Sequence, residues 1–133
     1  MAVRIVRLGS PRAENEGMRI GTVRRPPRGV PKSQFASKNW YDVWFPILAP
    51  SLAVMQLAHA AQTPAQFAAF MRRYRSEMRT RDAGHALDLL AALSHRTNFS
   101  VGCYCENESR CHRSVLRELL LARGAEVAPG EDA

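Results

Sequence analysis

The sequence has 133 residues, of which 46% are hydrophobic and 23% are charged, and this is the composition of a soluble globular domain. It contains no run near the roughly 18 apolar residues that a membrane-spanning helix needs, and its first residues lack the apolar core of a signal peptide. The three cysteines are an odd number, which does not suggest a disulfide scaffold. We therefore expect one domain over residues 1–133, a cytoplasmic location with reduced thiols, and no membrane partner.

The net charge of +7 is concentrated in the first third of the chain. Residues 1–39 hold nine basic residues and two acidic ones, whereas residues 40–133 hold ten of each. A localised basic region attracts phosphates, nucleic acid or acidic metabolites. The alternative is a solvated arm that has no partner.

Apolar and basic residues alternate loosely over residues 2–8, which predicts a strand there. Residues 9–17 are rich in Gly, Pro and Asn and predict a loop, and a second short strand is expected at 18–23. Residues 24–32 contain three prolines and a glycine, so they cannot form a helix. This stretch predicts a stiff loop that carries arginines.

Aromatic residues gather at 39–50 and predict about one turn of helix that ends at a proline. Ser51 is a suitable N-cap for a helix that runs to about residue 61. Thr63 begins a capping box with proline at the first helical position, which predicts the next helix. Leucines at helical spacing predict a further helix from about residue 84 to 94.

The short apolar run 98–105 is the best candidate for an interior strand. Ser109 is a plausible N-cap for a last helix, which Gly124 would end at its C′ position. Strands near both ends with several helices between them predict a small single-domain α/β sandwich, in which helices flank a short, mostly parallel sheet. Its core is expected at about residues 3–124, followed by a short strand or tail at 125–133.

All three cysteines lie in residues 103–113, in the run that follows the predicted interior strand and opens the last helix. With His112 they offer four soft ligands, the number that tetrahedral zinc requires. However, Cys103 and Cys105 on one strand would point to opposite faces, and Cys111 and His112 would lie about 100° apart on a helix. The spacing therefore argues against four converging ligands.

A second interpretation is thiol catalysis. A cysteine in the first turn of a helix is favoured as thiolate by the helix dipole, and Cys111 takes that place if Ser109 is the cap. Cys105 would lie in the loop that faces the same helix end. The catalytic candidates are therefore Cys105, Cys111 and His112, with either thiol as nucleophile and His112 as base.

A structural role is the alternative for the same residues. Cys111 shares a helix face with apolar residues and is predicted to be a small core side chain. His112 is then a buried, hydrogen-bonded histidine, and Arg113 shares the opposite face with Arg117, which indicates solvent. The histidines outside this run are predicted to be structural or surface residues: His59, His85 and His95.

The stiff loop and the start of the last helix could form one anion pocket. Arg24, Arg25 and Arg28 supply guanidinium groups suited to bidentate phosphate contacts. The helix start supplies free N–H groups and the positive end of a dipole. The aromatic residues expected to form a stacking wall, or alternatively core, are Trp40, Tyr41 and Trp44.

Several motifs together resemble one known family. The chain resembles the YeaO-like branch of the domain-of-unknown-function 488 family in the segment 24–30 and at Trp44, Ala49-Pro50-Ser51, Phe70, Tyr74 and Glu77. The chain resembles the main branch of that family in Cys105-Glu106 and Cys111-His112-Arg113-Ser114. The resemblance implies a compact cytosolic α/β domain and no particular reaction. The characteristic polar positions that it implies are Arg24, Arg28, Cys105, Glu106, Cys111, His112 and Arg113.

Our leading hypothesis is an anion-binding domain for a phosphate-bearing metabolite or nucleic acid. The ligand-binding candidates are Arg24, Arg25, Arg28, Glu106 and Arg113. The second hypothesis is the cysteine-dependent enzyme, and the third is metal binding by Cys105, Cys111 and His112, with or without Cys103. The resemblance does not include position 103, and no cofactor is predicted. Whether a reaction is catalysed, and the oligomeric state, stay open.

Overall fold

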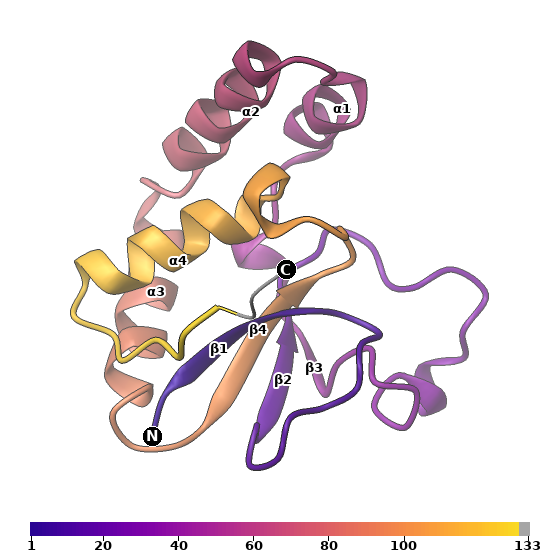
Figure 1. Ribbon diagram of the computed structural model, residues 1–133, viewed down its shortest axis with the longest axis vertical. Coiled ribbons are helices and arrows are strands. Elements are labelled where there is room, and N and C mark those ends of the chain that lie inside the picture. Colours follow the sequence, from indigo (N-terminus) through magenta and orange to yellow (C-terminus); the bar gives the residue numbers. More distant parts are fainter. Residues whose placement is uncertain (131–133) are drawn as a thin grey trace.

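The computed structural model describes residues 1–130. Its sheet has four parallel strands in the order β1-β4-β2-β3, and Figure 1 shows the helices gathered beside and above it. The strands are β1 Val3–Arg7, β2 Met18–Gly21, β3 Val43–Trp44 and β4 Phe99–Cys103. The α-helices are α1 Leu52–Ala60, α2 Pro64–Glu77, α3 Arg81–Leu93 and α4 His112–Ala122. The predicted small α/β fold with a parallel sheet is confirmed.

The helices pack on one face of the sheet. Val3 and Ile5 of β1 are in register with Phe99 and Val101 of β4, so these four side chains point to the same side. All four belong to one buried cluster. The same cluster contains a buried side chain from every α-helix: Val54, Phe70, Leu87 and Leu116.

Loops cover the opposite face of the sheet, and a buried ion pair holds them there. Arg19 of β2 is fully buried, and its guanidinium donates to the two carboxylate oxygens of Glu16 at 2.8 and 3.0 Å. Ser100 of β4 donates to the same carboxylate at 2.8 Å. Arg19 also donates to the carbonyl oxygens of Ser10 and Asn39. One arginine of the basic first third therefore stabilises the interior and is not available to a ligand.

The helix caps agree with the sequence. Ser51 accepts a hydrogen bond from the first turn of α1, and Thr63 and Gln66 form the predicted capping box. The helix α3 begins three residues before the predicted start, because Thr80 caps it by accepting a hydrogen bond from the backbone N–H of Ala83. Gly124 follows α4 with a φ of 78°, as its predicted C′ role requires.

The predicted boundaries around the cysteines need correction. The strand expected over 98–105 ends at Cys103, so Cys105 lies beyond the ladder. Ser109 is not the N-cap of the last helix but lies in a 3-10 turn, Glu108–Arg110. The helix α4 starts at His112, with Cys111 at the N-cap position. Cys111 therefore precedes the first helical turn and was wrongly placed inside it.

Two further segments differ in detail from the prediction. The aromatic run contains the predicted single helical turn as a 3-10 turn, Pro46–Leu48, and also the two-residue β3, which was not predicted. The last strand is reduced to one bridge between Val127 and Val3. No helix within residues 1–130 has the length and apolar character that a membrane crossing requires.

Candidate functional site

A cavity of about 920 Å³ opens at the carboxyl edge of the sheet. Because the strands are parallel, the segments that follow β1, β2 and β4 all begin at this edge. Residues 7–11, 23–28 and 103–105 line the cavity together with the start of α4 and part of α1. The arginine loop and the cysteine-bearing helix start thus line the same cavity.

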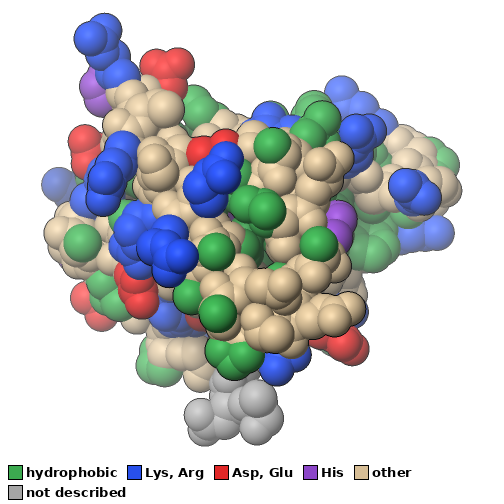
Figure 2. Space-filling view, turned by 90° about the horizontal axis from the view of Figure 1, so that it is seen from above, with side chains coloured by type: hydrophobic (Ala, Val, Ile, Leu, Met, Phe, Trp, Pro, Cys, Tyr) green, Lys and Arg blue, Asp and Glu red, His purple; other side chains and the backbone are tan. Residues whose placement is uncertain are grey.

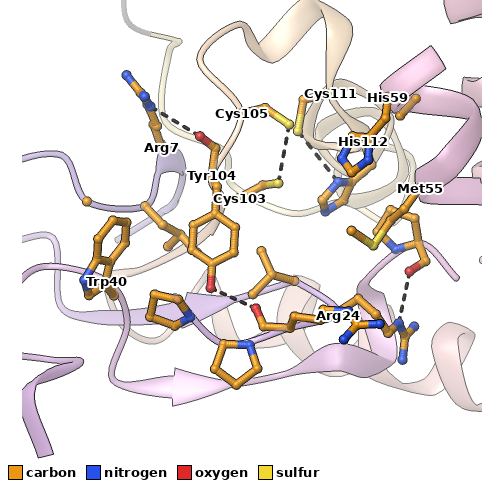
Figure 3. A pocket seen from close by; sticks show the side chains of 18 of the residues that line it. Arg7, Arg24, Trp40, Met55, His59, Cys103, Tyr104, Cys105, Cys111 and His112 are labelled. Atoms are coloured by element: carbon orange, nitrogen blue, oxygen red, sulfur yellow. Dashed lines mark hydrogen bonds between the residues drawn. The ribbon is translucent and has the colours of Figure 1, made fainter. Parts of the chain in front are cut away.

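Three thiols and one imidazole meet in this cavity (Figure 3). The Sγ atoms of Cys103 and Cys105 are 3.7 Å apart, and the Sγ atom of Cys111 lies 3.6 Å from Nδ1 of His112. The sulfur atoms of Cys103 and Cys111 and a ring nitrogen of His112 all lie within 4.8 Å of one another. Of the four residues, Cys105 is exposed and the other three are buried.

The convergence of the thiols corrects the prediction that Cys103 and Cys105 point to opposite faces. That prediction assumed a strand through residue 105, but β4 ends at Cys103. The chain bends after Cys103, and this bend turns the Cys105 thiol back toward Cys103. The family resemblance does not include position 103, but the structure places Cys103 in the cluster.

The end of β2 holds the ring of His112. Its Nε2 atom lies 2.9 Å from the carbonyl oxygen of Thr22, which can only accept, so Nε2 carries a proton and donates it. The ring of Tyr74 packs against the imidazole edge to face, with centroids 5.0 Å apart. In the neutral ring Nδ1 is then an acceptor directed at the Cys111 thiol. The prediction of a buried, hydrogen-bonded histidine is confirmed.

The three thiols differ in acidity because they hydrogen-bond to one another. Hydrogen bonds from the thiols of Cys103 and Cys105, and then the neighbouring His112, hold the pKa of Cys111 well below its ordinary value in spite of burial. The bonds of Cys103 to Cys105 and Cys111, together with burial, raise the pKa of Cys103. For Cys105 the bond from Cys103 lowers the pKa, but the bond with Cys111 and burial raise it more, to about 11.

Arg113 is buried, and the prediction that it faces solvent beside Arg117 is wrong. Only 4% of its surface is exposed, and its Nη2 atom donates to the carbonyl oxygen of Cys105. Within residues 1–130 no carboxylate pairs with this guanidinium, and its Nε atom has no hydrogen-bond partner. A buried cation with no counter-ion favours negative charge nearby, and its charge acts to lower the pKa of the Cys105 thiol.

The arginines of the stiff loop have different roles. Arg24 donates three hydrogen bonds to backbone carbonyl oxygens of residues 46–50, so it clamps the segment that leads into α1. Arg25 and Arg28 are exposed at the cavity and form no ion pair within the described part of the chain. Glu106 does not line the cavity, and its exposed carboxylate lies 3.9 Å from Arg7.

One wall of the cavity is aromatic. Trp40 and Tyr104 both line it and pack edge to face, with ring centroids 5.8 Å apart. The Tyr104 hydroxyl donates to the carbonyl oxygen of Arg25 at 2.9 Å, which ties this wall to the arginine loop. Tyr41 and Trp44, which were expected beside Trp40, do not line the cavity.

Sequence reasoning missed Arg7 and Tyr104 as lining residues, and it gave His59 no role at a site. Arg7 ends β1 and Tyr104 follows β4, so their places at strand ends could have indicated the cavity. Arg110 also lines the cavity, and its guanidinium is positioned over the ring of Phe67 in α2. His59 lies on the exposed side of α1 and reaches the cavity only because α1 folds back beside it.

The fold and the site together define a parallel α/β domain with a thiol- and arginine-lined cavity at the carboxyl edge of its sheet. Residues 3–124 match the family DUF488-N3a, described as the active DUF488-N3 subclade, and the chain belongs to this family. The predicted relationship to the domain-of-unknown-function 488 family is thereby confirmed. No curated protein and no solved structure matches the chain.

Proposed function

We propose that the cavity binds a phosphate-bearing metabolite that carries a flat ring, as nucleotides do. The observation that carries this proposal is the charge of the lining, which among residues 1–130 includes five arginines and no aspartate or glutamate. Guanidinium groups bind phosphate oxygens in a bidentate, charge-assisted way. The lining arginines are Arg7, Arg24, Arg25, Arg28 and Arg110.

Arg25 and Arg28 are the best candidates for direct phosphate contacts. Their guanidinium groups are free of ion pairs within the described residues, whereas Arg24 is occupied by backbone carbonyl oxygens. Figure 2 shows Lys and Arg side chains spread over the face seen from above, with several Asp and Glu side chains among them, and the net charge of +7 also favours anions. The cavity is within the size range of small-molecule sites, roughly 300–1,000 Å³.

The aromatic wall supports a ring as the other part of the ligand. Trp40 and Tyr104 present apolar surface beside the arginines, and base–aromatic stacking contributes about 1–3 kcal/mol per base. Because the hydroxyl of Tyr104 fixes the backbone at Arg25, the wall and the phosphate contacts are held relative to each other. Such a preorganised pair of contacts fits a nucleotide better than a bare anion.

The double variant Arg25→Ser/Arg28→Ser tests this proposal. We expect its affinity for a nucleoside triphosphate to fall at least roughly 10-fold, because two charge-assisted contacts are lost. Isothermal titration calorimetry with inorganic phosphate, a nucleoside monophosphate, a nucleoside triphosphate and a short single-stranded oligonucleotide measures the effect and ranks the ligands.

The matched control is Arg72→Ser/Arg73→Ser, which removes the same charge from the exposed side of α2. If this control loses as much affinity as the cavity variant, binding is a general effect of net charge and the proposal fails. Tighter binding of the oligonucleotide, with an affinity that falls steeply with salt, would instead identify nucleic acid as the ligand.

A second candidate function, cysteine-dependent catalysis, is favoured by the position of Cys111. Its thiol faces both the cavity and Nδ1 of His112, which can take the thiol proton while Sγ bonds to an electrophilic atom of the substrate and a leaving group departs with its electron pair. The description of the family as an active subclade is compatible with this role.

Alkylation of the reduced, metal-free protein tests the second candidate. We expect Cys111 to react at neutral pH with iodoacetate on the order of 10-fold faster, relative to iodoacetamide, than free cysteine does, because the arginines attract the anionic reagent. Mass spectrometry of the labelled peptides identifies the thiol. Exclusive labelling of the exposed Cys105, with no preference for the anionic reagent, would contradict this role for Cys111.

A further inference from the structure

We infer that Cys103, Cys111 and His112 hold a soft divalent cation such as Zn²⁺, with Cys105 as the fourth and displaceable ligand. The inference goes beyond anion binding and does not depend on the arginines. It starts from the fact that three thiols and an imidazole from two separate elements, the end of β4 and the start of α4, point toward one another (Figure 3).

Two separations within the cluster match those of a tetrahedral zinc site. Two sulfur atoms at about 2.3 Å from a tetrahedral zinc ion are roughly 3.8 Å apart, and a sulfur and an imidazole nitrogen are roughly 3.6 Å apart. The Sγ atoms of Cys103 and Cys105 are 3.7 Å apart, and the Sγ of Cys111 is 3.6 Å from Nδ1 of His112. The ligand atoms of the three buried members also lie within 4.8 Å of one another, so small side-chain movements would allow one ion to contact all three.

The surroundings of His112 are those of a metal-bound histidine. A ligating imidazole usually donates its other N–H to a carbonyl or carboxylate, which fixes the ring. Here Nε2 donates to the Thr22 carbonyl oxygen at 2.9 Å, and the lone pair of Nδ1 is left directed at the thiols. The hydroxyl of Thr22 also lies 3.2 Å from Nε2, so the ring is held from two positions.

Charge balance supports the same assignment. Three thiolates around a divalent cation leave one net negative charge, which is costly in a buried site unless it is compensated. The buried guanidinium of Arg113 donates to the backbone of Cys105 and has no carboxylate partner within residues 1–130. This otherwise unpaired cation balances the thiolate cluster.

The exposure of the four residues determines which position can open. Cys103, Cys111 and His112 are buried, whereas Cys105 is exposed in the loop after β4, and all four line the cavity. Three fixed protein ligands with one exchangeable position is the pattern of catalytic zinc, and a closed set of four is the pattern of structural zinc. If an anionic group of the ligand displaced the Cys105 thiolate, the cation would contact the same ligand that the arginines bind.

Cobalt titration of the reduced full-length protein, after metal removal with a chelator, tests the inference. We expect one equivalent of Co²⁺ to bind with intense thiolate-to-cobalt charge-transfer absorption, and Zn²⁺ to displace it. Cys103→Ser and Cys111→Ser should each weaken Co²⁺ binding more than roughly 100-fold, because the loss of an outer-shell partner alone costs 10–100-fold. Cys105→Ser should retain one equivalent with weaker charge-transfer absorption, since water can replace this ligand.

His59→Ala is the matched control, because His59 lines the same cavity but is not part of the cluster. It should bind Co²⁺ like the parent protein. Absence of charge-transfer absorption in the parent protein, or its persistence in both Cys103→Ser and Cys111→Ser, would overturn the inference. Circular dichroism identifies a variant that has not folded, and the exposed Cys105→Ser variant then still decides whether a thiolate site exists.

The same experiments separate a cation site from a free nucleophile. Zn²⁺ held by the cluster should suppress alkylation of Cys111 at least roughly 10-fold, as metal-bound thiolates are not free to react. Rapid alkylation of Cys111 that Zn²⁺ does not slow would favour the nucleophile and overturn the cation site. Nucleoside phosphate binding measured without metal reports on the anion proposal alone.

Discussion

Glu16→Gln is expected to lower the free energy of unfolding by about 3–5 kcal/mol, the range for removing one partner of a buried ion pair. The carboxylate of Glu16 is 3% exposed and accepts hydrogen bonds from Arg19, Ser100 and the backbone N–H of Ala13. Glutamine keeps the shape of the side chain but leaves the fully buried Arg19 without a counter-ion. Chemical denaturation followed by circular dichroism measures the loss.

Glu14→Gln is the matched control, since Glu14 is exposed in the same loop and should change stability by no more than about 0.5 kcal/mol. Similar losses in both variants would show that net charge, and not the buried pair, determines the effect. The comparison is informative because both glutamates belong to the loop 9–17, but only Glu16 pairs with the buried Arg19.

The same pair predicts how stability depends on pH. Burial raises the pKa of Glu16, but the hydrogen bonds from Arg19, Ala13 and Ser100 and the charge of Arg19 lower it more, so the net pKa lies below the ordinary 4.5. A lowered pKa in the folded state contributes stability above the unfolded value and loses it as the pH falls through the folded value. The difference in stability between the parent protein and Glu16→Gln should therefore narrow as the pH falls below about 4.5.

Leu116→Ala is expected to cost about 2–5 kcal/mol, because it opens a cavity in the centre of the core. Leu116 is fully buried on α4, in the cluster that joins the helices to β1 and β4. The helix α4 begins at His112, so loosening this contact also loosens the wall that carries the thiols. Chemical denaturation gives the loss of stability, and Co²⁺ affinity gives the effect on the cluster.

Leu121→Ala is the control on the same helix, since 53% of Leu121 is exposed. It should change the free energy of unfolding by no more than about 0.5 kcal/mol. Equal effects of the two substitutions would mean that α4 does not pack in the register described, and the position assigned to Cys111 and His112 would then be in doubt.

The local patterns of the sequence predicted most elements because those elements depend on neighbours in the chain. The capping serine at 51, the capping box at 63 and the glycine at 124 act on residues three or four positions away, and each does so in the structure. The start of α3 was predicted too late although Thr80 caps it, and the start of α4 was misplaced where no capping signal exists. Cys111 makes no side-chain capping bond at the start of α4, and nothing in the local sequence marks it as the cap.

The side chains of the site could be predicted only in part. Cys105, Cys111 and His112 were expected as a group because they lie close together in the sequence, and the structure confirms that they are neighbours in space. Arg113 was placed on the wrong side because its spacing with Arg117 resembles that of a solvated face. Helical spacing alone cannot show that the loop after β4 folds over α4 and covers one of the two arginines.

The sequence alone determined that this is a small α/β domain of the 488 family, with an arginine-rich loop and a cysteine-histidine run before the last helix. Those features are local, because composition, capping and periodicity act within a few residues. Only the tertiary structure decided that the two segments line one cavity and that Cys103 faces Cys105, Cys111 and His112. Parallel pairing of β1, β4 and β2 brings their carboxyl ends to one edge, and this long-range register has no signature in the separate segments.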